Sequence, residues 1–255
     1  MISWSSKRKF FIGGLILLGV GILVIIPAFF LLYEKPTCFD GKKNQNETGV
    51  DCGGSCVAIC QSDFLKPIVD WSRAFKVSEG AYSALAYLVN PNPSAGVERF
   101  EYKFTLYDEK NVVIAERYGF SSLPPGKPVP IFEGNILTGE REPVRSVFEI
   151  VSVLVWHKID SGTPNLKITS HEFSGGDNPR LKALVENKSS VPLVNFEVTA
   201  LLYDSNDNAL AVSRTVVDFL APNALKTIYF TWRLPMPAEV VRIEIKPKLY
   251  PGIQY

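Results

Sequence analysis

Four cysteines share one short window of this 255-residue sequence. They are Cys38, Cys52, Cys56 and Cys60, and the rest of the chain has none. Thiols at such spacing either pair as disulfides in an oxidising compartment or hold a zinc ion as thiolates. The window has almost no apolar side chain before Val57, so two disulfides would replace a missing core. We predict a disulfide-stapled module over residues 34–62, with zinc as the alternative and three pairings open.

The same window carries oxygen donors that could hold a cation. They are Asp40, Asn44, Asn46, Glu47 and Asp51. Calcium takes six to eight oxygen ligands from loops of this kind. The length from Asp40 to Asp51 equals that of an EF-hand loop, although Lys42 stands at a ligand position and Gln45 where that loop needs glycine. We keep calcium, bound by Asp40, Asn44, Glu47 and Asp51, as a hypothesis beside a plain staple, and no other cofactor is indicated.

Catalytic chemistry has little support elsewhere. The two histidines, His157 and His171, have no acidic or cysteine ligand at metal spacing, and we expect both to be solvated loop residues. No nucleophile elbow, zinc-protease helix or phosphate-binding glycine loop is present in the sequence. Lys and Arg number 27 against 26 Asp and Glu, so the net charge of +1 gives no basic field for nucleic acid. We predict no catalytic residue, no enzymatic activity and no nucleic-acid partner.

An apolar run from Phe10 to Tyr33 precedes the cysteine window. As a helix it would be about 36 Å long, and a bilayer core is about 30 Å thick, so the run predicts a transmembrane helix over residues 10–33. It is longer than the apolar part of a cleaved signal peptide and lacks small residues at its end, which favours a retained signal-anchor. The membrane lipid is therefore the first expected partner.

Basic residues set the expected orientation of that helix. Lys7, Arg8 and Lys9 precede it, and such an excess stays on the cytoplasmic side. Residues 1–9 become a cytoplasmic stub, and everything after residue 33 lies outside the cell membrane of a single-pass protein. Asn46 and Asn187 each begin a glycosylation sequon, which matters only in a host that glycosylates.

The remainder of the chain repeats itself. Phe100–Asp108 aligns with Phe196–Asp204, and the flanking segments align at nearly the same offset, which indicates a domain duplication. Apolar and polar side chains alternate in both copies, a pattern typical of antiparallel strands with one buried face. We predict an all-β fold with two tandem immunoglobulin-like antiparallel β-sandwiches, at residues 63–158 and 167–255, joined by a linker at 159–166.

The positions of five further aromatic residues in the sandwiches can also be predicted. Tyr107 and Tyr203 fall on the opposite face from the core, so we expect them to cover a sheet edge or bond to a turn. Trp71, Trp156 and Trp232 are expected between the two sheets of their sandwiches.

The motif Phe196–Asp204, with Val185–Ser189 before it, resembles the FxLYD domain, and Phe100–Asp108 resembles it less closely, having Tyr102 where the motif has Val. That resemblance implies an immunoglobulin-like sandwich of prokaryotic surface proteins and no catalytic residue. The cysteine window, Cys38–Cys60, resembles a short extracellular module of microbial surface proteins, and loosely the thrombospondin-type calcium repeats.

These features together predict a membrane-anchored envelope protein that acts as a non-enzymatic structural or binding module toward an unknown protein or envelope partner. Two alternatives stay open. One is an accessory subunit of a membrane complex for secretion or envelope assembly, and the other is a calcium-stabilised adhesion module.

Overall fold

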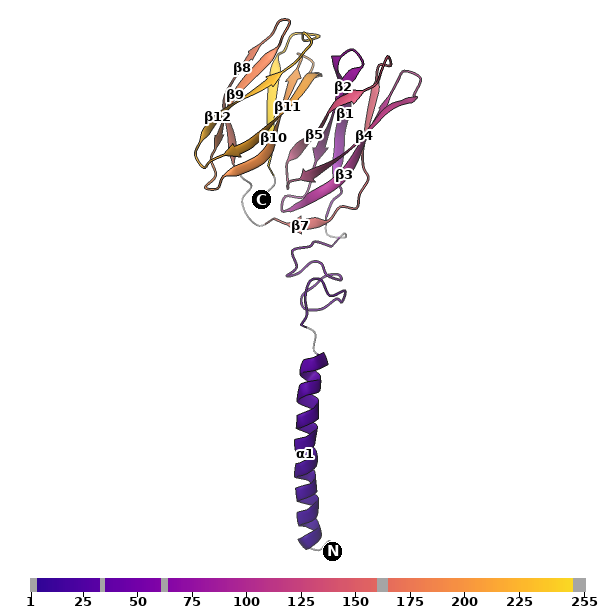
Figure 1. The fold of residues 1–255 in the computed structure, drawn as a ribbon, viewed down its shortest axis with the longest axis vertical. Coiled ribbons are helices and arrows are strands. Elements are labelled where there is room, and N and C mark those ends of the chain that lie inside the picture. Colours follow the sequence, from indigo (N-terminus) through magenta and orange to yellow (C-terminus); the bar gives the residue numbers. More distant parts are fainter. Residues whose placement is uncertain (1–3, 33–34, 61–63, 160–164, 250–255) are drawn as a thin grey trace.

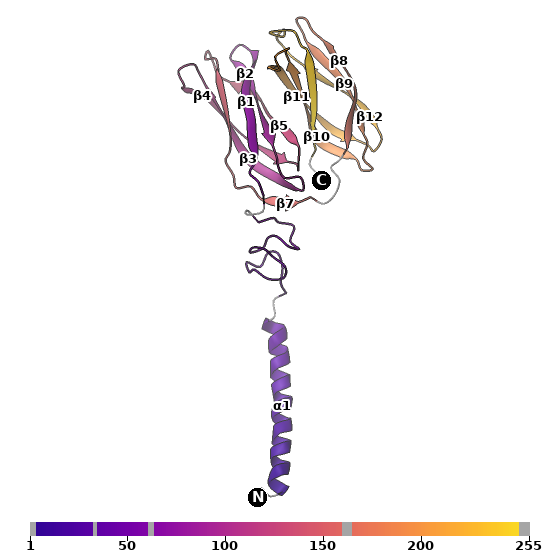
Figure 2. The same ribbon diagram turned by 180° about the vertical axis from the view of Figure 1, so that it is seen from behind.

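The computed structural model describes residues 4–32, 35–60, 64–159 and 165–249 (Figures 1 and 2). One helix, α1 (Trp4–Leu32), is followed by the irregular cysteine segment and then by the strands. Both views show the strands gathered in two bodies that lie side by side beyond the cysteine segment. Within the described residues, no helix combines the length and the hydropathy that crossing a membrane requires.

The first body is a β-sandwich of two antiparallel sheets. One sheet has the order β1-β2-β5 and the other β4-β3-β6, with a short β7 also paired to β3. The strands are β1 (Ile68–Ser78), β2 (Ala81–Val89), β3 (Ala95–Tyr107), β4 (Val113–Leu123), β5 (Pro128–Leu137), β6 (Arg145–Ile150) and β7 (Trp156–Lys158).

The second body repeats that topology, with a counterpart for each strand except β7. Its sheets have the orders β8-β9-β12 and β11-β10-β13, which correspond to β1-β2-β5 and β4-β3-β6. The strands are β8 (Leu166–Ser174), β9 (Arg180–Asn187), β10 (Leu193–Tyr203), β11 (Ala209–Leu220), β12 (Leu225–Thr231) and β13 (Arg242–Lys248). The all-β, antiparallel fold is thus confirmed. The linker predicted at residues 159–166 lies mostly outside the described residues.

Each sandwich encloses its own apolar core. In the first, Phe100 and Phe104 of β3 are buried against β2 and β5, and in the second Phe196 and Val198 of β10 are buried in the same way. The alternating pattern therefore assigns the core face correctly. Burial of such side chains, each contributing about 1.5–3 kcal/mol, supplies the main stabilisation of each sandwich.

The first copy compensates for its departure from the repeated motif. Tyr102 stands where the second copy has Val198, and its ring crosses the core so that its hydroxyl donates to Glu133 at 2.7 Å. The residue paired with Tyr102 across the sheet is Gly119, whereas Val198 is paired with Thr215. A Cβ at position 119 would lie 2.5 Å from the Tyr102 hydroxyl, so the larger tyrosine requires the glycine.

A buried asparagine closes one end of each sandwich. The Asn90 amide donates to the carbonyls of Ala95 and Pro124, and Asn187 at the matching position donates to those of Val191, Leu220 and Ala221. Asn187 is fully buried, so its sequon is closed to a glycosyltransferase in the folded protein. Loop carbonyls that would otherwise be unpaired are satisfied by one side chain in each copy.

Replacing Asn187 with Ala should lower the free energy of unfolding by about 3 kcal/mol, because three carbonyls lose their donor in a buried site. Thermal or denaturant unfolding of the full-length protein measures this. Asn206→Ala, at an exposed turn position of the same sandwich, is the matched control and should change stability little. Equal effects of the two substitutions would contradict the proposed role of Asn187.

Candidate functional site

The cysteine module between α1 and the first sandwich is held by two disulfides. Cys38 pairs with Cys56 and Cys52 with Cys60, and no free cysteine remains among the described residues. The predicted pairing of the four cysteines with one another is confirmed, and the structure selects one of the three possible connectivities. Gly41, Gly53 and Gly54 adopt positive φ, a conformation that glycine reaches at little cost, and so form the tight turns of the module.

Two of the predicted cation ligands bind backbone amides of the module. The Asp51 carboxylate accepts hydrogen bonds from the N–H groups of Asp40 and Gly41 at 3.0 and 2.9 Å. The Asp40 carboxylate accepts from the N–H of Thr37 and from the Asn44 amide, and these bonds hold the pKa of Asp40 below its ordinary value. The two aspartates therefore act as caps of the loop.

The other two predicted ligands are close to the first pair. The Glu47 carboxylate is buried, accepts from the Asn44 N–H at 3.1 Å and lies 3.3 Å from the Cys56 sulfur. The side-chain oxygen of Asn44 is buried and has no hydrogen-bond partner. The structure thus brings Asp40, Asn44, Glu47 and Asp51 into one hydrogen-bonded loop, and calcium binding there stays a prediction.

Zinc does not fit the module in this oxidised state. Potential ligand atoms of Cys38, Glu47 and Cys56 lie within 4.8 Å of one another in the described part of the chain. The two sulfurs are bonded to each other, so neither is the thiolate that zinc needs.

The module is attached to the first sandwich through backbone pairing. Ala58 forms a bridge with His157, the Ile59 N–H donates to the Trp156 carbonyl at 3.0 Å, and the Lys158 N–H donates to Val57. Phe64 also packs against the buried Trp156 ring, with centroids 4.5 Å apart. The module is therefore a docked base for the sandwich. His157 lies on β7 and His171 on β8, so the prediction that both occupy loops is wrong.

A third apolar cluster joins the two sandwiches, and we call it the seam. Its buried members come from both bodies and are Phe75, Leu85, Tyr87, Leu201, Tyr203, Ala209 and Val212, with Trp71 and Phe132 at its margin. The outer face of the β1-β2-β5 sheet packs there against the outer face of the β11-β10-β13 sheet. Strand β2 is consequently buried on both faces over most of its length.

One carboxylate crosses the seam and binds a tyrosine from each sandwich. Tyr87 and Tyr203 donate from their hydroxyls to the two oxygens of Glu244 at 3.1 and 3.0 Å. Burial, followed by the nearby Glu244 charge, raises the pKa of both tyrosines. Burial acts to raise the pKa of Glu244, but Lys246 and the two hydroxyl donors hold it below the ordinary value of 4.5. The guanidinium group of Arg242 lies 3.6 Å from the Tyr203 ring centroid.

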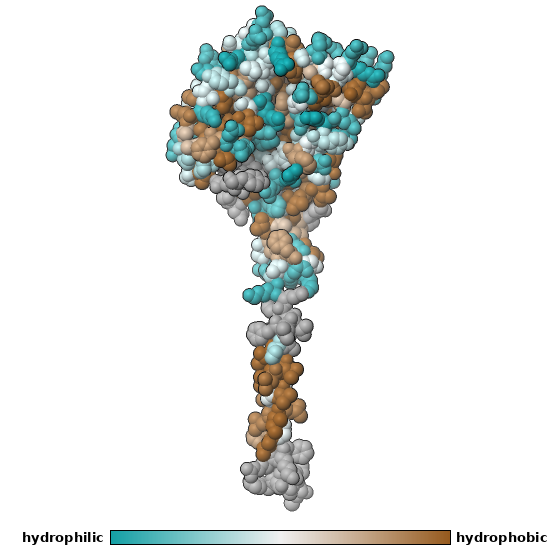
Figure 3. All heavy atoms as spheres, viewed as in Figure 1, coloured by the Kyte–Doolittle hydropathy of each residue, from teal (hydrophilic) through white to brown (hydrophobic). Residues whose placement is uncertain are grey.

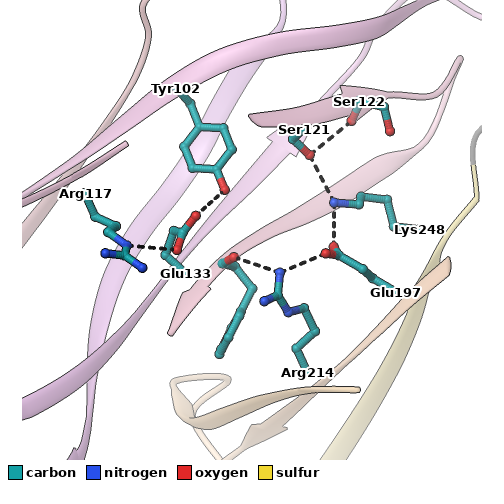
Figure 4. A network of polar contacts seen from close by, with 9 residues as sticks. Tyr102, Arg117, Ser121, Ser122, Glu133, Glu197, Arg214 and Lys248 are labelled. Atoms are coloured by element: carbon teal, nitrogen blue, oxygen red, sulfur yellow. Dashed lines mark hydrogen bonds and ion pairs between the residues drawn. The ribbon is translucent and has the colours of Figure 1, made fainter. Parts of the chain in front are cut away.

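Further polar contacts extend along the seam (Figure 4). Lys248 of the second sandwich donates to the Ser121 hydroxyl of the first at 3.1 Å and pairs with Glu197 at 2.6 Å. Arg214 also pairs with Glu197, at 2.8 Å, and reaches the Phe132 carbonyl across the seam at 3.5 Å. These side chains are polar, so they fix the relative orientation of the two bodies more than they add stability.

The seam was missed in the sequence analysis, and two aromatic residues were misplaced as a result. Tyr203 is buried in the seam and does not cover a sheet edge, and Trp71 stacks on Tyr87 at 5.7 Å outside the core of its own sandwich. The signal was the segment Ala81–Val89, which is apolar at nearly every position. A strand without alternation indicates burial on both faces.

No protein-family model matches the sequence, and no curated protein sequence matches it. Among solved structures, the crystal structure of red sea bream transglutaminase is similar at a TM-score of 0.24 and 10% sequence identity. The match covers 72% of this chain and 29% of that chain. A TM-score this low carries no argument about fold or activity.

If the loop binds calcium, millimolar Ca²⁺ should raise the melting temperature of the wild-type protein by mass action. Asp51→Asn should abolish that rise, since it removes one ligand charge. Asn tolerates the positive φ of 55° at this position and keeps a carbonyl acceptor, so the turn itself should survive. A melting temperature unaffected by Ca²⁺ would leave the disulfides and the backbone caps as the sole supports of the loop.

The Glu244 bridge predicts a pH dependence of stability. Its pKa is lower in the folded than in the unfolded protein, so its contribution is full above about pH 4.5 and is lost as the pH falls below that value. Between pH 6 and pH 3.5, the melting temperature of the wild type should therefore fall more steeply than that of Glu244→Gln. Parallel curves for the two proteins would show that Glu244 is not the group responsible.

Proposed function

We propose that this chain is a single-pass membrane-anchored protein of the cell envelope, whose two sandwiches form a non-enzymatic binding or structural head outside the membrane. The observation that carries the proposal is the apolar surface of α1, which no other segment covers in the described part of the chain. Phe11, Leu17 and Leu23 of α1 are 70–76% exposed, and Figure 3 shows the apolar surface along the helix. Lipid would cover such a surface, and the three basic residues before it favour a cytoplasmic N-terminus.

The oxidised module supports the external location of the head. Two disulfides persist where the surroundings are oxidising, as outside the cytoplasm. The motifs that resemble the FxLYD domain accord with the same location. In this proposal, the docked module holds the fused pair of sandwiches at a fixed distance from the lipid.

A binding or structural role is favoured over catalysis by the side chains available. In the described part of the chain every cysteine is in a disulfide, and the two histidines lie on different sandwiches. An activated nucleophile needs a base within hydrogen-bond reach. The seam instead joins two domains into one rigid surface, which suits a head that binds a partner outside the membrane.

The anchor and its orientation can be tested in cells that express the full-length chain, with membranes prepared in the presence of protease inhibitors. The protein should stay in the pellet on alkaline carbonate extraction, and an impermeant maleimide should label its cysteines on intact spheroplasts only after reduction. Leu17→Arg with Val20→Arg should release it, since each arginine at a helix centre opposes insertion by about 2.5–3.5 kcal/mol. Leu17→Phe with Val20→Leu is the matched control.

Release of the wild-type chain by carbonate would contradict the anchor, and labelling without reduction would contradict the external disulfides. Crosslinking with mass spectrometry in the same membranes separates a free-standing head from an accessory subunit. A subunit would show one dominant protein neighbour, lost when a foreign transmembrane helix replaces α1.

A further inference from the structure

A cavity of about 500 Å³ opens between the two sandwiches next to the seam. It is formed by β1 of the first sandwich, at Arg73–Val77, by β11 of the second, at Leu210–Arg214, and by the segment Thr231–Pro237, which begins at the last residue of β12. Strands β1 and β11 are both outer strands of their sheets and approach each other here (Figures 1 and 2). Its volume lies within the range of about 300–1,000 Å³ that small-molecule sites occupy.

Part of the cavity wall is aromatic and apolar. Phe75 and Phe132 come from the first sandwich, and Trp232, Leu234 and Met236 come from the second. The indole N–H of Trp232 donates to the Val212 carbonyl at 3.0 Å, which fixes the ring on the cavity side of β11. An apolar group of a ligand would be buried between rings supplied by both domains.

The charged part of the wall is of one sign. Four basic side chains line the cavity, Arg73, Lys76, Arg214 and Arg233, and no carboxylate is among the lining residues. Two of these basic side chains already form ion pairs within the chain: Lys76 pairs with Glu79 and Glu142, and Arg214 pairs with Glu197.

Arg73 and Arg233 are different. In the described part of the chain, neither guanidinium group forms a hydrogen bond or an ion pair, and the Arg73 guanidinium group lies 5.8 Å from the Phe75 ring centroid. Asp204 lies close enough for Arg73 to help lower its pKa, but its carboxylate already accepts the N–H groups of Asn206 and Asn208. Two guanidinium forks beside an apolar wall are thus left for an anion from outside the chain.

We propose that this interdomain cavity binds a carboxylate carried on an aromatic or aliphatic group. Arg73 and Arg233 pair with the carboxylate, and Phe75, Phe132 and Trp232 bury the apolar part. The inference deepens the proposed role as a binding head and gives that head a ligand class. Both sandwiches line the cavity, so a bound ligand also stabilises the seam.

Isothermal titration calorimetry on the full-length chain, purified in a mild detergent, tests the proposal. The probes are indole-3-propionate and its neutral amide, which differ only in the charged group. The acid should bind about tenfold more tightly than the amide, as expected for a charge-assisted hydrogen bond to an unpaired arginine. Arg73→Gln and Arg233→Gln should each weaken acid binding severalfold and leave amide binding unchanged.

Arg99→Gln is the matched control. Its guanidinium group lies 4.1 Å from the Phe120 ring centroid and has no ion pair among the described residues, and Arg99 is not part of the cavity lining. It should bind the acid like the wild type. None of the three substitutions leaves a carboxylate without its partner, so all three variants should fold.

A second pair of probes identifies the source of the carboxylate. Acetyl-Trp-Glu-amide and acetyl-Trp-Gln-amide present the same groups as part of a peptide. Preference for the acid in the peptide pair alone indicates a protein ligand, and preference in the free-acid pair alone indicates a small molecule; both support the proposal. Equal affinity for acid and neutral probe in both pairs would overturn it, as would an equal loss in Arg99→Gln or no binding at millimolar concentration. Membrane attachment does not enter these measurements, so the two proposals fail separately.

Discussion

Burial of a second sheet face is the interaction on which the rest of this structure depends. Each sandwich already has a core, and strands β2 and β10 then place a further row of apolar side chains, including Leu85 and Leu201, against the other sandwich. This contact turns two small domains into one body. The hydrophobic effect that drives this contact is non-directional. The hydrogen bonds of Glu244 with Tyr87 and Tyr203, and that of Lys248 with Ser121, fix how the two domains are oriented.

The cysteine module at the base of the head also depends on contact with a neighbouring domain. The cysteine module has too few apolar residues for a core, so disulfides and aspartate caps hold its loops. Ile59 near its end, and Phe64 just beyond it, then pack against the core of the first sandwich, where Phe64 contacts Trp156. The first sandwich is therefore held in a fixed orientation relative to the module.

Local patterns in the sequence were sufficient for the parts of the fold that are local. The duplicated motif and the alternation at Phe100–Asp108 and Phe196–Asp204 predicted two copies of one antiparallel unit, and the cysteine spacing predicted the disulfides. The connectivity of the disulfides could not be predicted, because it depends on how the loop folds back. The seam and its cavity could not be predicted either, since they arise where residues such as Tyr87 and Glu244, far apart in the chain, meet through the orientation of two domains.

The two copies do not use the same face to meet each other. The first contributes its β1-β2-β5 sheet, and the second contributes its β11-β10-β13 sheet, the counterpart of β4-β3-β6. The contact is therefore heterologous, and no twofold axis relates the two copies. A contact of this kind leaves one sheet face of each copy free, so further copies could in principle add to form a ring or an open filament. Composition opposes such growth on the second sandwich: Lys182 is exposed on its free sheet face, at the position that corresponds to Leu85 in the contact. A charged side chain there disfavours burial against a further copy, and a hydrophobic replacement of Lys182 would remove that obstacle.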